Sequence, residues 1–171
     1  TGYLWWEIDD VVDKRRALER IKIDSFSNEL STRKVFAFDI DGTLLLGERA
    51  VDGAAELLDW LHKRGNTVAF VTNNSSMTNA DHISRINRVL GKAYGSEKVV
   101  SSLDHLQAYM SRPGGQVPSM YCLLNERVKR MLRESGLPLT EESPSGPVVV
   151  GFDTELTYEK LRRACIHIQE G

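Results

Sequence analysis

The chain has 171 residues, of which 41% are hydrophobic and 27% are charged, an ordinary composition for a globular protein with one core. Its net charge of −2 argues against an extended nucleic-acid surface, which needs a clear basic excess. No apolar run approaches the roughly 20 residues of a membrane span, so we expect neither nucleic acid nor a membrane as a partner.

The first 30 residues differ from the rest of the chain and carry no motif with recognisable chemistry. Residues 11–21 have helical spacing, and residues 25–34 form a polar connection. We therefore predict that residues 1–30 are an N-terminal extension with a packing or regulatory role. The chain starts with Thr1 rather than Met, which suggests a processed, trimmed or partial chain.

From residue 33 onward, predicted strands alternate with predicted helices. The apolar runs at 35–38 and 67–71 predict strands buried on both faces. Further strands are predicted at 98–101, 119–124 and 148–153, and helices at 52–65, 78–91, 102–110, 126–136 and 157–171. This order predicts an α/β fold: a Rossmann-like, three-layer α/β/α arrangement in which helices cover both faces of a parallel sheet.

Two further features concern helix ends and cysteines. Asp52, Thr78 and Thr157 are predicted to cap three of the helices. Cys122 and Cys165 do not form a disulfide framework, and both are predicted to be small core residues in a reducing compartment. We therefore expect a cytoplasmic protein.

The stretch FAFDIDGTL (36–44) places two aspartates at the end of the first strand. Asp39 and Asp41 are two residues apart, so an extended backbone turns both carboxylates to one face. A divalent cation such as Mg²⁺ would make two adjacent anions tolerable. A surface turn rich in Asp and Gly is an equal alternative for this motif taken alone. A calcium loop does not fit, because its twelfth position is Ala50 instead of Glu.

The second strand ends in VTNNSS (71–76), directly before a helix. The hydroxyl and amide groups of Thr72, Asn73 and Asn74 suit phosphate binding at a helix N-terminus. Turn formation and helix capping explain the same residues equally well. Carboxyl ends of neighbouring parallel strands share one sheet edge, so we expect this loop and Asp39 to form one site.

In combination, these motifs resemble the haloacid dehalogenase-like hydrolases. DIDGTL with the nearby Gly47, and VTNNSS, look like the first and second motifs of that family. VVVGFDTELTYEKL (148–161) closely resembles the start of the large inserted cap in its type-two-capped branch, which includes para-nitrophenyl phosphatase, phosphoglycolate phosphatase and pyridoxal phosphatase. The resemblance runs from about residue 33 to the end of the chain.

The resemblance implies a Mg²⁺-dependent phosphatase that acts on small phosphomonoesters. Asp39 would be the nucleophile, forming an aspartyl-phosphate, and Asp41 would be the general acid and base. Mg²⁺ would bind the Asp39 side chain and the backbone carbonyl of Asp41. The substrate phosphate would be bound by Gly42, Thr72, Asn73 and Asn74.

Two motifs of the family are not found after these. The third, a Lys that balances the phosphate charge, and the fourth, a GDxxxTD-like acidic segment, follow the cap in the family. We therefore expect residues 31–146 to be an incomplete core and 147–171 the beginning of a cap domain, and we expect the isolated chain to be weakly active or inactive. The resemblance leaves open a homodimer of the full-length protein, because the cap often carries the dimer surface in this branch.

The same motifs fit two other kinds of function less well than phosphatase activity. A catalytically inactive module for binding or regulation would keep the fold, although the retained Asp39, Asp41 and Thr72 weigh against it. Phosphoryl transfer to another acceptor, or dehalogenation, would use the same scaffold. Dehalogenation is disfavoured because Asp41, Gly42 and Thr43 match the phosphatase form of the first motif. The residues do not reveal which phosphate ester is the substrate.

Overall fold

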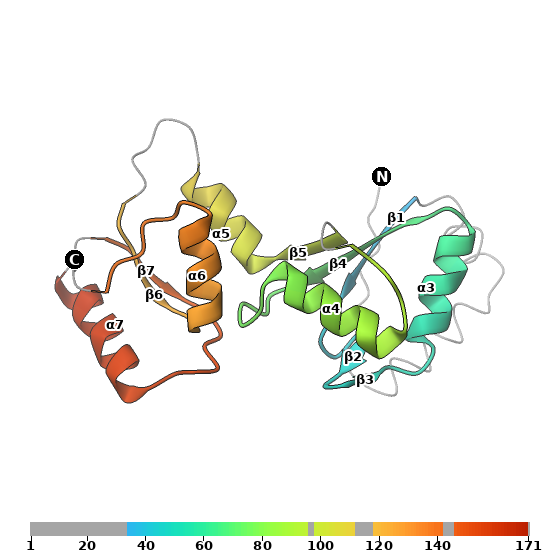
Figure 1. The fold of residues 1–171 in the computed structure, drawn as a ribbon, viewed down its shortest axis with the longest axis horizontal. Coiled ribbons are helices and arrows are strands. Elements are labelled where there is room, and N and C mark those ends of the chain that lie inside the picture. The colour runs from blue at the N-terminus through green and yellow to red at the C-terminus, as the bar shows by residue number, and fades with distance from the viewer. Residues whose placement is uncertain (1–33, 96–97, 112–117, 142–145, 171) are drawn as a thin grey trace. The chain divides into compact units, whose positions relative to one another are not determined.

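The computed structural model describes residues 34–95, 98–111, 118–141 and 146–170 (Figure 1). The predicted extension at residues 1–30 therefore lies outside the described part of the chain. The chain divides into two compact units. The first takes Thr1–Val71 and Arg85–Lys98, and the second takes Thr72–Ser84 and Val99–Gly171.

The first unit is built around two parallel strands. Strand β1 (Val35–Asp39) pairs with β4 (Thr67–Thr72), and the register runs from Val35 opposite Thr67 to Asp39 opposite Val71. Between them in the chain come three elements: the short antiparallel strands β2 (Leu45–Leu46) and β3 (Arg49–Ala50), and helix α3 (Ala54–Lys63). Helix α4 (Asn79–Leu90) follows β4 and contributes residues to both units. The predicted β1-α3-β4 succession is confirmed here, whereas the β2–β3 hairpin between β1 and α3 was not predicted.

Burial in the first unit differs from the prediction for its strands. Phe70 of β4 and Leu58 of α3 are fully buried, as an inward-facing pattern requires. However, β1 alternates between exposed and half-buried residues, and Val35 is 64% exposed. The prediction that β1 and β4 are buried on both faces was wrong, because β4 also alternates and its Val71 is 42% exposed. Within the described residues β4 is the only strand that pairs with β1, so one edge of β1 has no neighbour there to cover it.

The helix ends show why these residues form helices where they do. At α4 the predicted cap is confirmed: the Asp81 amide donates to the Thr78 hydroxyl, while the Thr78 amide donates to the Asp81 carboxylate. At α7 (Tyr158–Glu170), the Lys160 amide donates to the Thr157 hydroxyl at 3.2 Å, also as predicted. The predicted cap Asp52 was wrong, because α3 is preceded by Gly53, whose φ of +83° only glycine adopts readily.

The second unit contains another pair of parallel strands. Strand β6 (Tyr121–Leu123) pairs with β7 (Val148–Val150), from Tyr121 opposite Val148 to Leu123 opposite Val150. The unit also contains β5 (Val99–Ser101) and the helices α5 (Ser102–Met110), α6 (Glu126–Glu134) and α7. The predicted boundary between core and cap, at residues 146 and 147, falls between the two paired strands β6 and β7. It stays a prediction.

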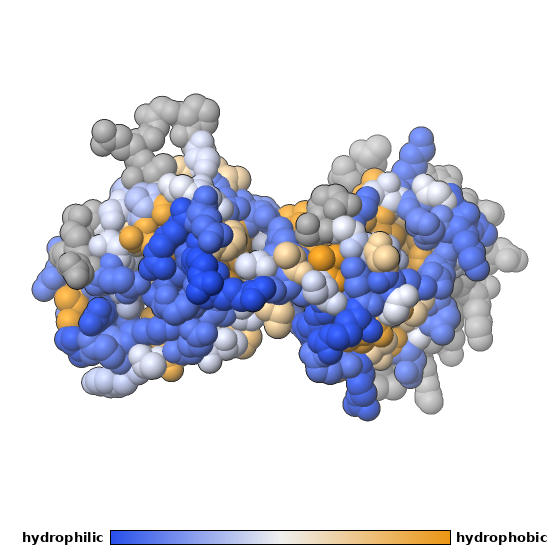
Figure 2. All heavy atoms as spheres, viewed as in Figure 1, coloured by the Kyte–Doolittle hydropathy of each residue, from blue (hydrophilic) through white to orange (hydrophobic). Residues whose placement is uncertain are grey.

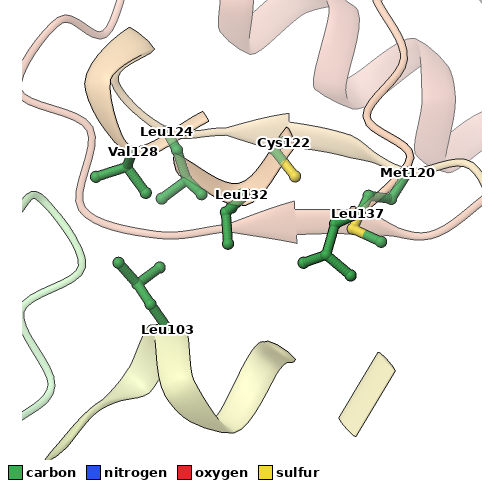
Figure 3. Close-up of a cluster of buried hydrophobic side chains, with 7 residues drawn as sticks. All are labelled: Leu103, Met120, Cys122, Leu124, Val128, Leu132 and Leu137. Atoms are coloured by element: carbon green, nitrogen blue, oxygen red, sulfur yellow. The ribbon is translucent and has the colours of Figure 1, made fainter. Parts of the chain in front are cut away.

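The core of this unit consists of apolar side chains from α5, β6, α6 and the segments next to them. Figure 3 shows these residues, which are all at most 6% exposed: Leu103, Met120, Cys122, Leu124, Val128, Leu132 and Leu137. All three residues of β6 are buried, as expected of a strand covered on both faces. Cys122 is therefore a core residue, as predicted, but the same prediction for Cys165 was wrong because its side chain is exposed on α7.

The face of the described residues that Figure 2 shows is largely hydrophilic, with apolar side chains interspersed. Among the described residues, no helix combines the length and apolar character that crossing a membrane requires.

Candidate active site

The first motif forms a tight turn directly after β1. Ile40 is fully buried and its carbonyl accepts a hydrogen bond from the Leu45 amide at 2.9 Å. Gly42 has a φ of +86° and donates its amide to the Leu45 carbonyl at 2.8 Å, so the turn needs a residue without a Cβ at this position. Because Ile40 points into the core, Asp39 and Asp41 on either side of it are both exposed. The turn thus presents two carboxylates to solvent.

Asp39 keeps its carboxylate accessible at the end of β1. The Thr43 hydroxyl donates to Asp39 Oδ2 at 3.3 Å, which orients the carboxylate weakly from four residues away. Within the described residues, no Lys, Arg or His forms an ion pair with Asp39. Its negative charge is therefore not neutralised by this part of the chain. A carboxylate that binds a cation or acts as a nucleophile needs to be accessible in this way.

Asp41 lies against a buried arginine from α4. Arg85 Nη1 donates to Asp41 Oδ1 at 2.8 Å, and Arg85 Nη2 donates to the carbonyl of Gly47 at 2.7 Å. Arg85 Nε lies 3.6 Å from a carboxylate oxygen of Glu48. The Arg85 side chain is only 10% exposed and that of Asp41 is 41% exposed. One guanidinium therefore holds both the second aspartate of the motif and the turn of the β2–β3 hairpin.

Arg85 was not predicted as a site residue, because it lies within a helix and a basic site residue was expected at a strand end. A helical signal was present: Arg85 is three residues after His82 and next to Ile86, and both of these residues are fully buried. A basic residue on the buried side of a helix needs a buried or half-buried anion as its partner.

The second motif forms a compact loop at the start of the second unit. The Asn74 amide donates to the Thr72 hydroxyl at 3.0 Å. Asn74 Oδ1 accepts from both the amide and the hydroxyl of Ser76, at 3.0 and 2.7 Å, and the Asn74 carbonyl is 3.0 Å from His82 Nε2. The Asn74 side chain thus stabilises the turn. Turn formation was the alternative to phosphate binding that the sequence left open for this residue. Asn73 is exposed.

The same loop is attached to other elements of the second unit. Asn125 Nδ2 donates to the Ser76 carbonyl at 2.6 Å, and the Phe152 amide donates to Ser75 Oγ at 2.7 Å. Gly151 lies so close to this loop that an added Cβ would be 2.5 Å from Ser75 Oγ. These contacts hold residues 75 and 76 from two sides and fix the loop before α4 begins.

Electrostatics at the start of α4 are set by Asp81. Burial raises the pKa of Asp81, but hydrogen bonds from Arg127 and Thr78 outweigh burial and hold the pKa below its ordinary value. A carboxylate in the first turn also interacts favourably with the helix dipole. The helix that follows the second motif is thus anchored by an ionised Asp81.

The predicted site residues therefore fall into two local groups. Asp39, Asp41 and Gly42 share the turn after β1, and Thr72, Asn73 and Asn74 share the loop that begins at the last residue of β4. Asp39 is the register partner of Val71, the residue directly before Thr72. The first group belongs to the first unit, and the second group, which begins at Thr72, belongs to the second unit.

The first unit is a parallel α/β unit with two exposed aspartates at the end of its first strand, Asp39 within β1 and Asp41 just after it. Comparison with known proteins identifies the family. A model described as haloacid dehalogenase-like hydrolase matches residues 36–138. The chain belongs to the haloacid dehalogenase-like hydrolase family, which confirms the resemblance inferred from its motifs and the Rossmann-like α/β fold class.

The similar proteins include phosphatases. An acid sugar phosphatase from Staphylococcus aureus is 30% identical over 138 residues, which make up 81% of this chain and 52% of that protein. A 4-nitrophenylphosphatase from Thermotoga maritima has a TM-score of 0.72 at 31% identity, over 83% of this chain and 53% of that one. A glycerol phosphate phosphatase from Mycobacterium tuberculosis, solved in complex with magnesium, has a TM-score of 0.64 at 25% identity, over 81% of this chain and 42% of that one. The chain spans about half the length of the curated relatives it matches.

Proposed function

We propose that the protein hydrolyses small phosphate monoesters through an aspartyl-phosphate on Asp39. The observation that carries this proposal is the exposed Asp39 carboxylate at the end of β1, without an ion-pair partner in the described residues, in a family whose similar members are named as phosphatases. Sugar phosphates, 4-nitrophenyl phosphate and glycerol phosphate are named for the relatives. They define the substrate class that we propose for this protein: a phosphate monoester of a small alcohol or phenol.

The proposed reaction has two steps that use the two aspartates in turn. In the first, an oxygen of the Asp39 carboxylate forms a bond to phosphorus while the bond from phosphorus to the ester oxygen breaks. Asp41 gives its proton to that ester oxygen, so the alcohol leaves uncharged. In the second, Asp41 takes a proton from water as the water oxygen attacks phosphorus, and inorganic phosphate leaves while the Asp39 carboxylate is restored.

The loop that begins at Thr72 would hold the transferring phosphoryl group. We assign phosphate binding to the Thr72 hydroxyl, to Asn73 and to the turn at Gly42, whose own amide already donates to the Leu45 carbonyl. Hydroxyl, amide and backbone N–H groups stabilise the charge that develops on phosphate oxygens. Asn74 supports this role by shaping the loop through Ser76, in addition to any contact of its own with phosphate.

The residues present fit a magnesium ion. The proposed donors are the Asp39 carboxylate and the backbone carbonyl of Asp41. The described residues contain no cluster of three His, Cys, Asp or Glu side chains that could hold a metal. Mg²⁺ keeps several waters and binds through one or two carboxylates together with substrate phosphate, so a small protein contribution suits it. When bound, Mg²⁺ would offset the repulsion between Asp39 and the anionic substrate.

The test is hydrolysis of 4-nitrophenyl phosphate by the full-length gene product, with Mg²⁺ and with excess chelator. We expect turnover that is lost with the chelator and reduced by at least about 1,000-fold in Asp39→Asn, because the amide cannot attack phosphorus. Glu56→Gln, which removes an exposed carboxylate from α3 in the same unit, is the matched control and should leave the rate unchanged. A protein that binds phosphate but turns over neither this ester nor a sugar phosphate would instead be the inactive binding module. The cytoplasmic location and a homodimer of the full-length protein also remain predictions.

A further inference from the structure

We propose that Arg85 is a positioning residue that orients the Asp41 carboxylate for proton transfer to the leaving alcohol. This inference rests on the proposed function. It goes further by assigning a role to a residue on α4 that belongs to neither the first motif nor the loop at 72–76. The relevant geometry is the fork of Arg85, with Nη1 on Asp41 Oδ1 and Nη2 on the Gly47 carbonyl.

The two bonds of the fork fix the guanidinium from two sides. The Gly47 carbonyl lies in the turn between β2 and β3, and it accepts from Nη2 at 2.7 Å. With that side anchored, Nη1 has a fixed position from which it donates to Asp41 at 2.8 Å. The guanidinium is planar and rigid, so fixing one nitrogen also fixes the direction of the other. The Asp41 carboxylate is therefore held in one orientation relative to the hairpin.

Burial makes this arrangement different from an ordinary surface ion pair. The Arg85 side chain is 10% exposed, and a guanidinium at such a position is costly unless acceptors satisfy its donors. Asp41 and the Gly47 carbonyl accept from Nη1 and Nη2, whereas Nε has no hydrogen-bond partner among the described residues. Arg88, one turn further along α4, provides the contrast: it is 65% exposed and pairs with Glu48 at 2.6 Å. Arg88 is thus a surface partner of the same hairpin, whereas Arg85 contacts the aspartate itself.

Orientation of Asp41 matters most for proton transfer to the ester oxygen of the leaving alcohol. Proton transfer requires the donor to lie within hydrogen-bond reach of the ester oxygen, and a displacement of about 1 Å can cost on the order of 100-fold in rate. An alkyl alcohol leaves poorly unless it is protonated, whereas 4-nitrophenol leaves readily as the phenolate. Loss of positioning should therefore slow the hydrolysis of an alkyl phosphate much more than that of 4-nitrophenyl phosphate.

The test compares these two leaving groups by kcat/KM, which covers the steps up to release of the alcohol. The full-length gene product is assayed with glycerol phosphate and 4-nitrophenyl phosphate, as wild type and as Arg85→Ala, Arg85→Lys and Arg88→Ala. We expect Arg85→Ala to lose about 100-fold on glycerol phosphate and less than about 5-fold on 4-nitrophenyl phosphate. Arg88→Ala, the matched control, should change neither value.

Arg85→Lys keeps a positive charge at this position, so it still tests the proposal if Arg85→Ala does not fold. A single ammonium does not reproduce the fork that reaches Asp41 and Gly47 together, so we expect a selective loss of about 10-fold on glycerol phosphate. Equal losses on both esters in either Arg85 variant, or no loss in both, would overturn the positioning role while the phosphatase activity stands. A folded wild-type protein that hydrolyses neither ester would overturn the proposed function and this inference with it.

Discussion

Asn125 links helix α6 to the second-motif loop, and its replacement should show what that link contributes. Its Oδ1 accepts a hydrogen bond from the Val128 amide at 3.0 Å, which caps α6. Its Nδ2 donates to the Ser76 carbonyl at 2.6 Å, a contact between residues 49 apart in the chain. Asn125 is 5% exposed, so neither partner gains a water easily when the side chain is removed.

The expected cost of Asn125→Ala combines two effects. Loss of an N-cap side chain costs about 1 kcal/mol of the free energy of unfolding. A carbonyl left buried without a donor costs about 1–3 kcal/mol more, so the total is about 3 kcal/mol. Asn125→Ser retains a capping oxygen but no donor that reaches Ser76, and should lose about 2 kcal/mol.

Urea denaturation followed by circular dichroism measures these losses directly. Thr157→Ala is the matched control, because Thr157 is an exposed N-cap whose hydroxyl accepts from the Lys160 amide at 3.2 Å. It should cost about 1 kcal/mol. If Asn125→Ala destabilises the protein no more than Thr157→Ala, the Asn125–Ser76 hydrogen bond contributes nothing to stability, and the attachment of the second-motif loop to α6 is refuted.

Two further predictions concern titrating groups in the second unit. Because the folded-state pKa of Asp81 is lowered, its stabilisation is present above its unfolded pKa of about 3.9 and is lost as the pH falls through the lower folded value. Asp81→Asn should therefore destabilise the protein at about pH 7, and the difference from wild type should shrink in urea titrations at about pH 3; a difference that does not depend on pH would contradict this. Burial raises the pKa of the Cys122 thiol to about 11, whereas Cys165 is exposed. Iodoacetamide should therefore modify Cys165 in the native protein and Cys122 only after unfolding, as peptide mass mapping would show, and rapid native labelling of Cys122 would be inconsistent with its burial.

The order of the longer strands and of the helices was predictable from local patterns, whereas the two-residue strands β2 and β3 were not predicted. Apolar runs and amphipathic spacing gave the positions of all five predicted strands and all five predicted helices to within a few residues, because each pattern reports on the local backbone period. The Thr78 cap was also predictable, since Asp81 three residues later completes a reciprocal pair. The cap of α3 was not, because the choice between Asp52 and Gly53 depends on a left-handed φ that the sequence does not reveal.

Features that depend on distant segments were harder to predict. The exposure of Val35 reflects which strands lie beside β1, and a run of apolar residues carries no information about its neighbours. The exposed Cys165 shows the same limit on a helix, where a small residue is compatible with either face. Arg85 was missed because its partner Asp41 is 44 residues away in the chain. The motifs predict which residues carry the proposed chemistry, but they do not predict the contact between Arg85 and Asp41.

The most direct test of the account is to trap the proposed covalent intermediate. The full-length gene product is mixed with a phosphate ester and Mg²⁺, quenched rapidly in acid and treated with sodium borohydride, which reduces an acyl phosphate to an alcohol. We expect peptide mass spectrometry to find homoserine at position 39, and not at position 41, in a fraction of chains that falls when substrate is exhausted. Substrate turnover without reduction at Asp39, or with reduction at another carboxylate, would contradict the account.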